Sequence, residues 1–442
     1  MGDKNSEIPN IGHKISRRDF LKLGGATAAG AAIGYVAWRL GIKLETSGLP
    51  ETELKPSVRV LDFFDIDQAK DKYLQDNFPS NFSEENSWQE MGVSDPSTRE
   101  GLLKAVPKDE SQVKLLMMAL FQQRYQNHGK DVVAVMEKVS GLVNPDKKTV
   151  IPTRSSITGA VEFGRLEYDE IGNPTIHVTL SSDVVDRLVS ETPESVVNMS
   201  FELGDFSLTY SLYDRKLKYP EMGRQGPSKI TVGGKTSYRD YQGNDITEEE
   251  YNEISRKMNE TEIELLNPSE RDVRFIDGYA GDKTYQNLQK LTEIARKNPE
   301  KMFVAAGGNP TYLKGLKIPD IRDARAKLEE QGLWPENLII VGFQARESGF
   351  VGQASYGADI YVADKDLEEL GFSGASSYAT PVVTEITRRV VYAGSKTHKQ
   401  AREGLMALTQ AAETYEGSEK VYYPLLDLGK VKNSFASSSQ SQ

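Results

Sequence analysis

The chain has 442 residues, of which 38% are hydrophobic, and this is enough for one large folded domain or two ordinary ones and excludes disorder of the whole chain. It contains no cysteine and only four histidines, so disulfides, thiolate metal sites and a cysteine nucleophile are excluded. The net charge of −11 argues against a nucleic-acid partner, because phosphate binding needs a basic surface.

Residues 1–45 are interpreted as a targeting segment. The run SRRDFLK at residues 16–22 precedes an uncharged stretch of residues 23–38 made mostly of Gly and Ala. This pattern resembles a twin-arginine (Tat) export signal, which implies the Tat translocon as a partner and an extracellular, periplasmic or cell-surface location. The uncharged stretch is shorter than the ~20 apolar residues of a spanning helix. No small-x-small cleavage pattern follows it directly, so retention as a membrane anchor stays open.

After a linker at residues 46–55, buried strands and amphipathic helices alternate. This alternation predicts an α/β fold of three layers, with a mostly parallel central sheet covered on both faces and functional residues at the carboxyl ends of its strands. The predicted strands are Val58–Leu61, Ile176–Leu180, Ser195–Met199, Met302–Ala306 and Asn337–Gly342. The predicted helices are Ser111–Gln126, Asp131–Val143, Asp183–Ser190, Thr284–Lys297, Ile321–Gln331, Pro381–Tyr392 and His398–Tyr415.

Two segments differ from this alternation. Residues 205–278 are rich in Tyr, Gly and charge, and we interpret them as an inserted subdomain of hairpins with one helix near Glu248–Met258. Residues 431–442 end in a Ser/Gln-rich run that predicts a disordered tail. The organisation is therefore one domain at residues 56–430 that carries an insertion.

Ser377 is the first candidate for chemistry. It lies at the start of a helix whose apolar residues share one face, where unpaired N–H groups and the helix dipole favour an oxyanion. The alternative is a plain serine N-cap. A serine nucleophile needs a base, and His128 is the best placed histidine because Gly129 allows a close backbone approach. The other three are interpreted as a signal residue (His13), a strand residue (His177) and a helix-cap or surface residue (His398).

Four motifs in this order resemble the subtilisin-like serine proteases (subtilases). Residues 60–62 with 66–67 resemble the aspartate motif, residues 127–134 the histidine motif and residues 375–381 the serine motif. Residues 303–309 resemble the strand and turn that end in the oxyanion-hole asparagine. The resemblance extends over roughly residues 56–204 and 279–430. It implies a serine endopeptidase with the triad Asp62, His128 and Ser377, and with Asn309 in the oxyanion hole.

The resemblance also implies that a peptide or protein substrate adds as a strand to the edge after residue 199. The implied substrate-binding residues are Ser200, Phe201, Glu202, Gly204, Ala305, Ala306 and Gly307. Glu202 would favour a basic or polar side chain if it points inward, although a solvated edge residue is the alternative. No cofactor is implied beyond structural calcium, for which the acids Asp62, Asp65 and Asp67 are candidates without a loop of committing spacing.

The sequence departs from the family pattern at several positions. Phe63 and Phe64 follow Asp62 where the family has glycine, so Asp65 is a rival for the triad carboxylate. Other changes flank His128 and Ser377, and no inhibitory prodomain is apparent between the signal and the first strand. A catalytically impaired, secreted binding module therefore stays open as an alternative. An esterase or lipase is a third, but its Gly-x-Ser-x-Gly elbow is missing around Ser377.

Overall fold

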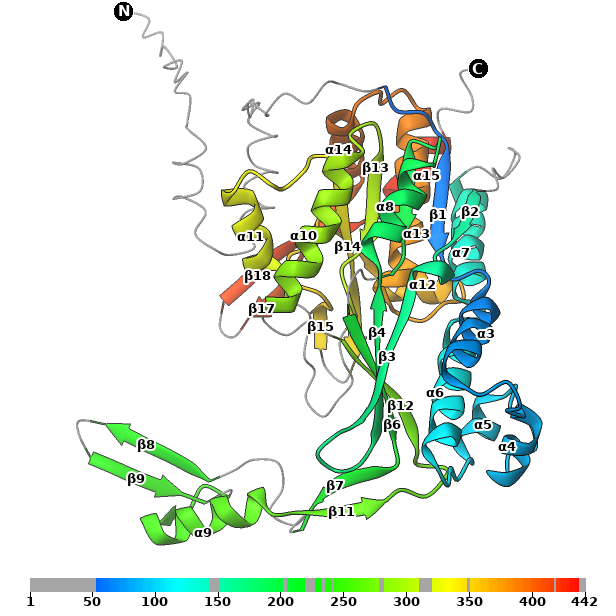
Figure 1. Cartoon of the computed structure of the whole chain (residues 1–442). Helices are drawn as coiled ribbons and strands as arrows, with labels where there is room; N and C mark the ends of the chain where they lie inside the picture. The colour runs from blue at the N-terminus through cyan, green and yellow to red at the C-terminus, as the bar shows by residue number, and fades with distance from the viewer. Residues whose placement is uncertain are drawn as a thin grey trace, which may run out of the picture.

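The computed structural model describes residues 53–143, 152–201, 205–218, 227–232, 235–240, 242–277, 282–309, 320–347, 350–416 and 419–436. Within these residues the body is a mixed α/β sandwich around a nine-stranded, largely parallel sheet (Figure 1). Its strands are β1 (Val58–Asp62), β2 (Thr153–Ser156), β5 (Val196–Met199), β13 (Met302–Ala306), β14 (Leu338–Glu347), β15 (Phe350–Gln353), β16 (Ile360–Ala363), β17 (Thr409–Glu416) and β18 (Glu419–Leu426). They follow the order β17-β18-β16-β14-β13-β5-β1-β2, and β15 pairs with β14.

The order of the strands changes direction at β1. It pairs in parallel with β2 on one side and with β5 on the other, and β5 pairs in parallel with β13. Such a switch point opens a crevice at the carboxyl ends of the strands, which is where open α/β sheets bind ligands. The residues that end or follow β1, β5 and β13 here are Asp62, Ser200 and Gly307. The alternation of buried strands and helices thus predicted the central sheet and the location of its crevice.

Helices cover both faces of the sheet. One face packs against α7 (His128–Val143), α12 (Asp364–Glu369), α13 (Ser376–Tyr392), α14 (His398–Ala407) and α15 (Leu428–Ala436). The other packs against α8 (Ser182–Ser190), α10 (Asp282–Lys297) and α11 (Arg322–Glu330). Side chains of a strand point alternately to the two faces. Val58 and Val60 lie in the core beside α7 and Leu61 lies in the opposite core, so Asp62 is on the α7 side.

Four helices fill the connection between β1 and α7. They are α3 (Ile66–Asn77), α4 (Glu84–Glu90), α5 (Arg99–Leu103) and α6 (Glu110–Tyr125). The sequence analysis predicted only α6 of these. Its apolar run of Leu115 to Phe121 is buried on every side, so a continuous hydrophobic signal marked it. The shorter helices α4 and α5 are largely polar and are fixed by the N-caps Ser83 and Thr98.

An arm of antiparallel strands projects from the body (Figure 1). Its base is a four-stranded sheet in the order β12-β6-β4-β3. The strands and helix of the arm are β3 (Val161–Tyr168), β4 (Pro174–Leu180), β6 (Asp205–Ser211), β7 (Tyr213–Leu217), β8 (Ser228–Val232), β9 (Lys235–Arg239), β10 (Asp245–Ile246), α9 (Glu248–Asn259), β11 (Thr261–Leu265) and β12 (Asp272–Asp277). The hairpins and single helix agree with the prediction, but the base of the arm also takes in residues 161–180.

Four predictions need correction. The strand Ile176–Leu180 belongs to the antiparallel base of the arm and not to the parallel sheet, because β4 pairs with β3 and β6. The helix predicted for His398–Tyr415 ends at Ala407, and the residues after it form β17, whose long antiparallel pairing with β18 outweighs helix propensity. The tail does not begin at residue 431, since α15 continues to Ala436 and buries Val431 in the core. Leu54, assigned to the linker, is 1% exposed and donates its N–H to the carbonyl of Lys396.

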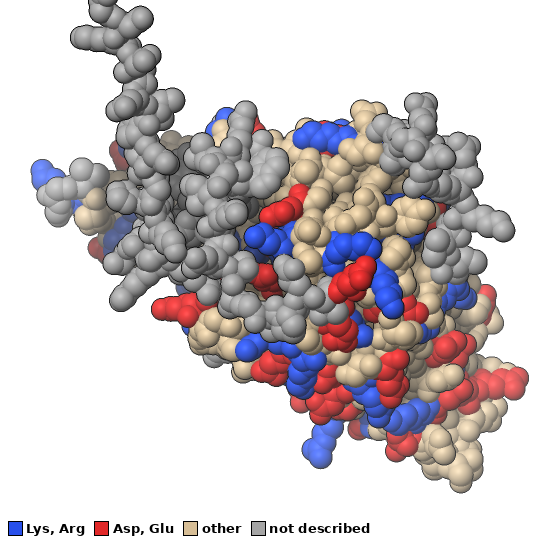
Figure 2. Space-filling view, turned by 90° about the horizontal axis from the view of Figure 1, so that it is seen from above, with Lys and Arg blue, Asp and Glu red and all other residues tan. Residues whose placement is uncertain are grey.

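Charges of both signs alternate over the face of the body shown in Figure 2. The described residues of this face therefore offer no continuous basic surface. None of the helices in the described ranges combines the length and the apolar character that a membrane crossing requires. Residues 1–52, which include the predicted targeting segment and most of the linker, lie outside the described residues.

Candidate active site

The structure brings Asp62 and His128 together. Asp62 is the last residue of β1 and His128 the first of α7, and their atoms Oδ1 and Nδ1 are 2.6 Å apart. Asp62 is fully buried, and the same oxygen accepts the backbone N–H of Phe63 at 2.7 Å. Asp65, the rival carboxylate, instead precedes α3. Because the carboxylate accepts at Nδ1, the hydrogen of a neutral imidazole is assigned to Nδ1, and Nε2 is left with its lone pair.

The pKa of His128 results from two opposing effects. Burial lowers it, because a charged imidazole is poorly solvated there, but the negative charge of Asp62 and its hydrogen bond outweigh burial and raise the pKa above its ordinary value. Arg124 opposes this rise and Asp131 adds to it, each more weakly. A buried carboxylate that stabilises an imidazolium is what a general base needs when it accepts a proton.

A glycine allows the close approach of α7 to β1. The N–H of Gly129 donates to the carbonyl of Phe63 at 3.3 Å. A Cβ on Gly129 would lie 2.7 Å from that carbonyl oxygen and 2.9 Å from the ring of Phe64. Real Cβ atoms are not found so close to backbone atoms, so only glycine fits here without displacing α7. The interpretation of Gly129 from sequence, a close backbone approach beside the imidazole, is confirmed.

Ser377 is the second residue of α13. The N-cap of this helix is Ala375, which has no capping side chain, so the interpretation of Ser377 as a plain N-cap is wrong. The first turn also holds Asn309: its Oδ1 accepts the backbone N–H of Ser376 at 2.6 Å. Because Oδ1 of the Asn309 side chain accepts this bond, its Nδ2 group lies on the opposite side of the side-chain amide. Ser377 and Asn309 therefore lie at one helix N-terminus, where N–H groups and the dipole favour negative charge.

Two glycines let the chain turn from β13 to Asn309. Gly307 donates its N–H to the carbonyl of Val341 at 2.8 Å, and a Cβ on it would lie 3.1 Å from that oxygen and from the Ile340 side chain. Gly308 has a φ of 92°, in the region that favours glycine. The two residues together bring the chain off the sheet and under the N-terminus of α13, where Asn309 meets Ser376.

Aromatic rings surround His128, a feature that the sequence analysis missed. The ring of Tyr378 stacks on the imidazole with centroids 6.0 Å apart and planes inclined by 28°. Phe63 and Tyr125 meet it edge-on at 6.5 and 6.0 Å. Tyr378 directly follows Ser377, so this contact places the N-terminus of α13 beside the imidazole. Burial raises the pKa of the Tyr378 hydroxyl, and the carboxylate of Asp131 adds to the rise. Phe63 and Tyr378 are far from His128 in the sequence, and no local pattern signals their contact with it.

A hydrogen-bonded chain joins the strand next to β1 with α13. Asn198 on β5 donates from Nδ2 to the hydroxyl of Thr384 at 2.8 Å, and its Oδ1 accepts the hydroxyl of Ser200 at 2.9 Å. All three side chains are at most 1% exposed. Buried polar groups persist when each finds a partner. These bonds therefore fix α13 on β5, the inner strand whose carboxyl end leads into the predicted substrate site.

The predicted substrate-binding residues lie on two adjacent strand ends. Ser200 and Phe201 follow β5 and are 1% and 8% exposed. Ala305 and Ala306 end β13 and are 1% and 6% exposed, and Gly307 follows them. Because β5 and β13 pair in register, with Met199 opposite Ala305, these residues lie side by side at the carboxyl ends of the two strands. Glu202 and Gly204 lie outside the described residues, so the predicted role of Glu202 is still a prediction.

The other histidines have separate surroundings. His177 lies on β4 in the arm, half exposed, between the hydroxyl of Ser207 and the carboxylate of Glu167, which agrees with its interpretation as a strand residue. His398 is the first residue of α14, after the N-cap Thr397, and burial lowers its pKa. His13 lies outside the described residues. Of the histidines that the structure describes, His128 is thus the one paired with a buried carboxylate.

The three acids considered for calcium have different environments. Asp62 pairs with His128, Asp67 accepts from Gln122 at 2.5 Å, and Asp65 precedes α3. Across the described ranges, no group of three or more His, Cys, Asp or Glu side chains is arranged to hold a metal ion. Structural calcium therefore stays a prediction that no such cluster supports among the described residues.

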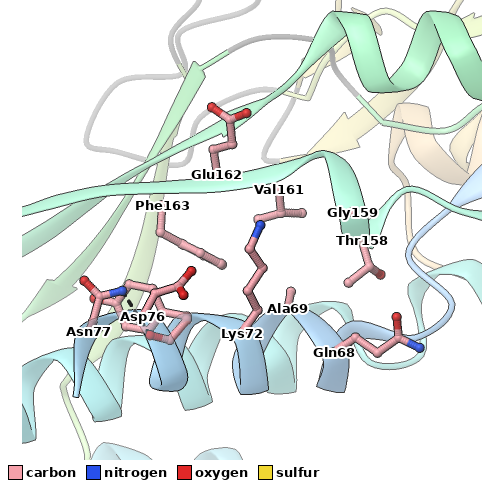
Figure 3. A pocket seen from close by; sticks show the side chains of 11 residues that line it. Gln68, Ala69, Lys72, Asp76, Asn77, Thr158, Gly159, Val161, Glu162 and Phe163 are labelled. Carbon is pink, nitrogen blue, oxygen red and sulfur yellow. Dashed lines mark hydrogen bonds between the residues drawn. The ribbon is translucent and has the colours of Figure 1, made fainter. Parts of the chain in front are cut away.

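A hollow of about 310 Å³ lies between α3 and the start of β3. Figure 3 shows Lys72 extending from α3 toward β3, while Glu162 points away on the other side of that strand. The remaining lining includes Asp76, Thr158 and Phe163, but no histidine. The hollow adjoins the segment that leaves the sheet beside Asp62, where Ile157 donates its N–H to the Asp62 carbonyl at 2.9 Å. It lacks an acid–base pair of the Asp62–His128 kind, so the candidate active site is at the switch point.

Comparison with known proteins identifies one segment of the chain. Residues 14–34 match the TAT (twin-arginine translocation) pathway signal sequence. This agrees with the interpretation of residues 16–38 and shows that the protein is exported across the membrane through interaction with the Tat translocon. No curated protein and no solved structure matches the chain.

Proposed function

We propose that the protein is an exported, subtilisin-like serine endopeptidase, in which Ser377 is the nucleophile, His128 the general base and Asp62 the orienting carboxylate. The observation that carries the proposal is the 2.6 Å contact of a fully buried Asp62 with His128 Nδ1, next to a helix that begins with Ser376 and Ser377. The general base and the carboxylate that orients it are two of the three members of a catalytic triad, and here they are in contact.

The surroundings of Ser377 support its proposed role. Hydrolysis of an amide passes through a tetrahedral oxyanion, which is stabilised by preorganised N–H donors. The first turn of α13 supplies the backbone N–H of Ser377. Asn309, fixed through its Oδ1 by Ser376, supplies an amide N–H beside it. These two donors form the proposed oxyanion hole.

The proposed reaction has two balanced halves. The Ser377 hydroxyl oxygen bonds to the peptide carbonyl carbon as His128 Nε2 takes its proton, and the carbonyl electron pair moves to the oxyanion. The C–N bond then breaks as His128 returns the proton to the leaving amine, and an acyl-serine remains. Water attacks that ester with the same base, and the carboxylic acid and free Ser377 are released. Asp62 stays ionised and stabilises the imidazolium in both halves.

The proposed substrate is an extended peptide or protein segment. It would pair with the backbone that follows β5, where Ser200 and Phe201 lie, next to the end of β13. The hydroxyl of Ser200 already donates to Asn198, so we assign its side chain a structural role and only its backbone a role in substrate pairing. Main-chain pairing gives affinity without specifying a side chain, and the peptide sequence that is cut remains open.

The test uses protein lacking residues 1–45, together with Ser377→Ala. A fluorophosphonate probe forms a covalent bond with an activated serine, and casein and a short ester serve as substrates. We expect labelling and casein cleavage by the parent protein and neither by Ser377→Ala. Ser376→Ala is the matched control, because it removes the neighbouring hydroxyl and keeps the backbone N–H that Asn309 accepts.

Each outcome separates the proposal from its two alternatives. Absence of labelling that depends on Ser377 would overturn every hydrolase interpretation and would favour the secreted binding module. Labelling with ester cleavage alone would favour an esterase. Casein cleavage that disappears in Ser377→Ala but persists in Ser376→Ala would support the endopeptidase.

A further inference from the structure

A cluster of charged side chains is buried on α13, away from the proposed triad. Glu385, Arg388 and Arg389 are 2%, 4% and 6% exposed. Glu385 accepts from Arg388 Nε at 2.7 Å and from Arg389 Nε at 2.9 Å. Burying three charged groups costs solvation that their mutual attraction often fails to repay, so such a cluster is weak evidence for stability. The best attested benefit of buried polar groups between helices is a fixed register.

One member of the cluster reaches the neighbouring helix. Arg389 donates from Nη2 to the hydroxyl of Ser140 on α7 at 2.7 Å, and to its carbonyl oxygen at 3.4 Å. Ser140 is 2% exposed. Glu385 holds the other side of the same guanidinium, so the planar group is aimed at α7 from a fixed position. These bonds join α7 and α13 directly.

The Arg389–Ser140 bond lies the same number of residues along each helix from the two proposed catalytic residues. Ser140 follows His128 by twelve residues in α7, and Arg389 follows Ser377 by twelve residues in α13. At 1.5 Å per residue each interval is about 18 Å along its helix. The two helices also meet at their first turns, through the rings of His128 and Tyr378. They therefore run parallel, with the rings at one end and the polar join at the other.

The packing between these two contacts is apolar. Val132, Val139, Val383 and Ile386 belong to the same core. Apolar contacts are non-directional, and small side chains of similar size permit neighbouring packing registers. A slip of one turn would move His128 by about 5.4 Å relative to Ser377, whereas proton transfer needs hydrogen-bond reach of about 3 Å. The bonds Asp62–His128 and Asn198–Thr384 hold each helix to its own strand, and the Arg389–Ser140 bond opposes such a slip directly between the two helices.

We propose that Arg389, aimed by Glu385, is a positioning residue that fixes the axial register of α7 on α13 and so the placement of His128 against Ser377. The inference rests on the proposed function. It assigns a purpose to buried charges that neither bind substrate nor contact the triad. The loss of the join should therefore slow acylation of Ser377 by more than the loss of stability explains.

The test compares Arg389→Met, Ser140→Ala and their double variant with Arg402→Met as the matched control. Methionine fills much of the space of arginine without its donors, and Ser140→Ala retains all three buried charges. Arg402 also bonds a buried carboxylate, Asp359, but it joins α14 to the sheet and not α7 to α13. Fluorophosphonate labelling rates are measured at 25 °C on protein shown to be folded by circular dichroism, and His128 is titrated by NMR.

We expect labelling at least tenfold slower in Arg389→Met and at least threefold slower in Ser140→Ala, with the double variant no slower than Arg389→Met. Arg402→Met should label within twofold of the parent even if its unfolding midpoint falls. The pKa of His128 should fall in Arg389→Met as its contact with Asp62 loosens. Folded Arg389→Met with parental labelling and an unmoved pKa would overturn the inference.

Two other results would also decide whether the inference stands. If Arg389→Met does not fold, Ser140→Ala decides alone, and labelling within 1.5-fold of the parent overturns the inference. If the parent is not labelled at Ser377, the proposed function fails. The register is then judged by the His128 titration, where a pKa equal to the parent's in both single variants overturns it.

Discussion

Replacement of Asp62 by Asn tests the pairing on which the proposed site depends. In the native protein one oxygen of Asp62 accepts both His128 Nδ1–H at 2.6 Å and the N–H of Phe63 at 2.7 Å. The second oxygen, Oδ2, is buried without a partner among the described residues. If the Asn oxygen takes the place of Oδ1, its NH2 group must occupy this site without an acceptor. An unpaired buried donor costs about 1–3 kcal/mol.

The opposite orientation of the Asn amide is worse for chemistry. Its NH2 would then face the N–H of Phe63, and His128 would have to present an unprotonated Nδ1. Nε2 would carry the hydrogen and could not accept the proton of Ser377. Loss of the triad carboxylate in serine hydrolases lowers the rate by about 10⁴-fold, which corresponds to roughly 5.5 kcal/mol of transition-state stabilisation. We therefore expect Asp62→Asn to label with fluorophosphonate about 10³- to 10⁴-fold more slowly than the parent protein.

The pH dependence of stability provides an independent measurement on the same variant. Asp62 raises the folded-state pKa of His128 above the ordinary value of 6.5. This pairing therefore stabilises the fold fully below that ordinary pKa, and the stabilisation is lost as the pH rises through the folded pKa. In Asp62→Asn the largest remaining influence on His128 is burial, which lowers the pKa, while Arg124 and Asp131 act weakly in opposite directions, so acidification should destabilise the variant instead.

Urea unfolding of both proteins between pH 5 and pH 8, with NMR titration of His128, measures this difference. Asp65→Asn is the control, because it makes the same chemical change at a carboxylate that precedes α3, whereas the partner of His128 is Asp62. Labelling of Asp62→Asn within threefold of the parent, or a His128 pKa that does not fall, would refute the reasoning.

Three further substitutions test other parts of the site. Asn309→Ala removes a proposed oxyanion donor and should lower the labelling rate by about 10²- to 10³-fold with an unchanged pH profile; a loss under threefold in a labelling assay contradicts the role. Asn198→Ala removes the acceptor of the buried Ser200 hydroxyl and the donor to Thr384, whose hydroxyl still donates to the Thr380 carbonyl; it should destabilise by about 1–3 kcal/mol in urea unfolding, and a smaller change would show that Ser200 finds another acceptor. Gly129→Ala forces a Cβ against the Phe63 carbonyl and should lower both the unfolding midpoint and the labelling rate, whereas Gly141→Ala, which has open space, should lower neither.

Local sequence signals predicted the targeting segment and four of the nine strands of the central sheet, at β1, β5, β13 and β14. The Tat signal depends on a short contiguous pattern, and residues 14–34 match it. Strands β1, β5 and β13 are runs of apolar residues, because both faces of a parallel sheet are covered. Gly129 could be interpreted from sequence because a missing side chain permits a close backbone approach. The error at residues 409–415 arose because β17 is defined by its pairing with β18.

Only the tertiary structure shows that Asp62 and not Asp65 contacts His128, since Asp62 ends β1, Asp65 lies three residues later, and the contact depends on which one meets α7. The same holds for the stacking of Tyr378 on His128, the bond from Ser376 to Asn309 and the bond of Arg389 with Ser140. Each of these pairs residues that are far apart in the chain, and pairing of this kind leaves no mark in local hydrophobic periodicity. The sequence alone therefore determined which chemical groups are present and the approximate place of the main strands and helices of the body. Their distances and directions were set by the packing of α7 and α13 on one sheet.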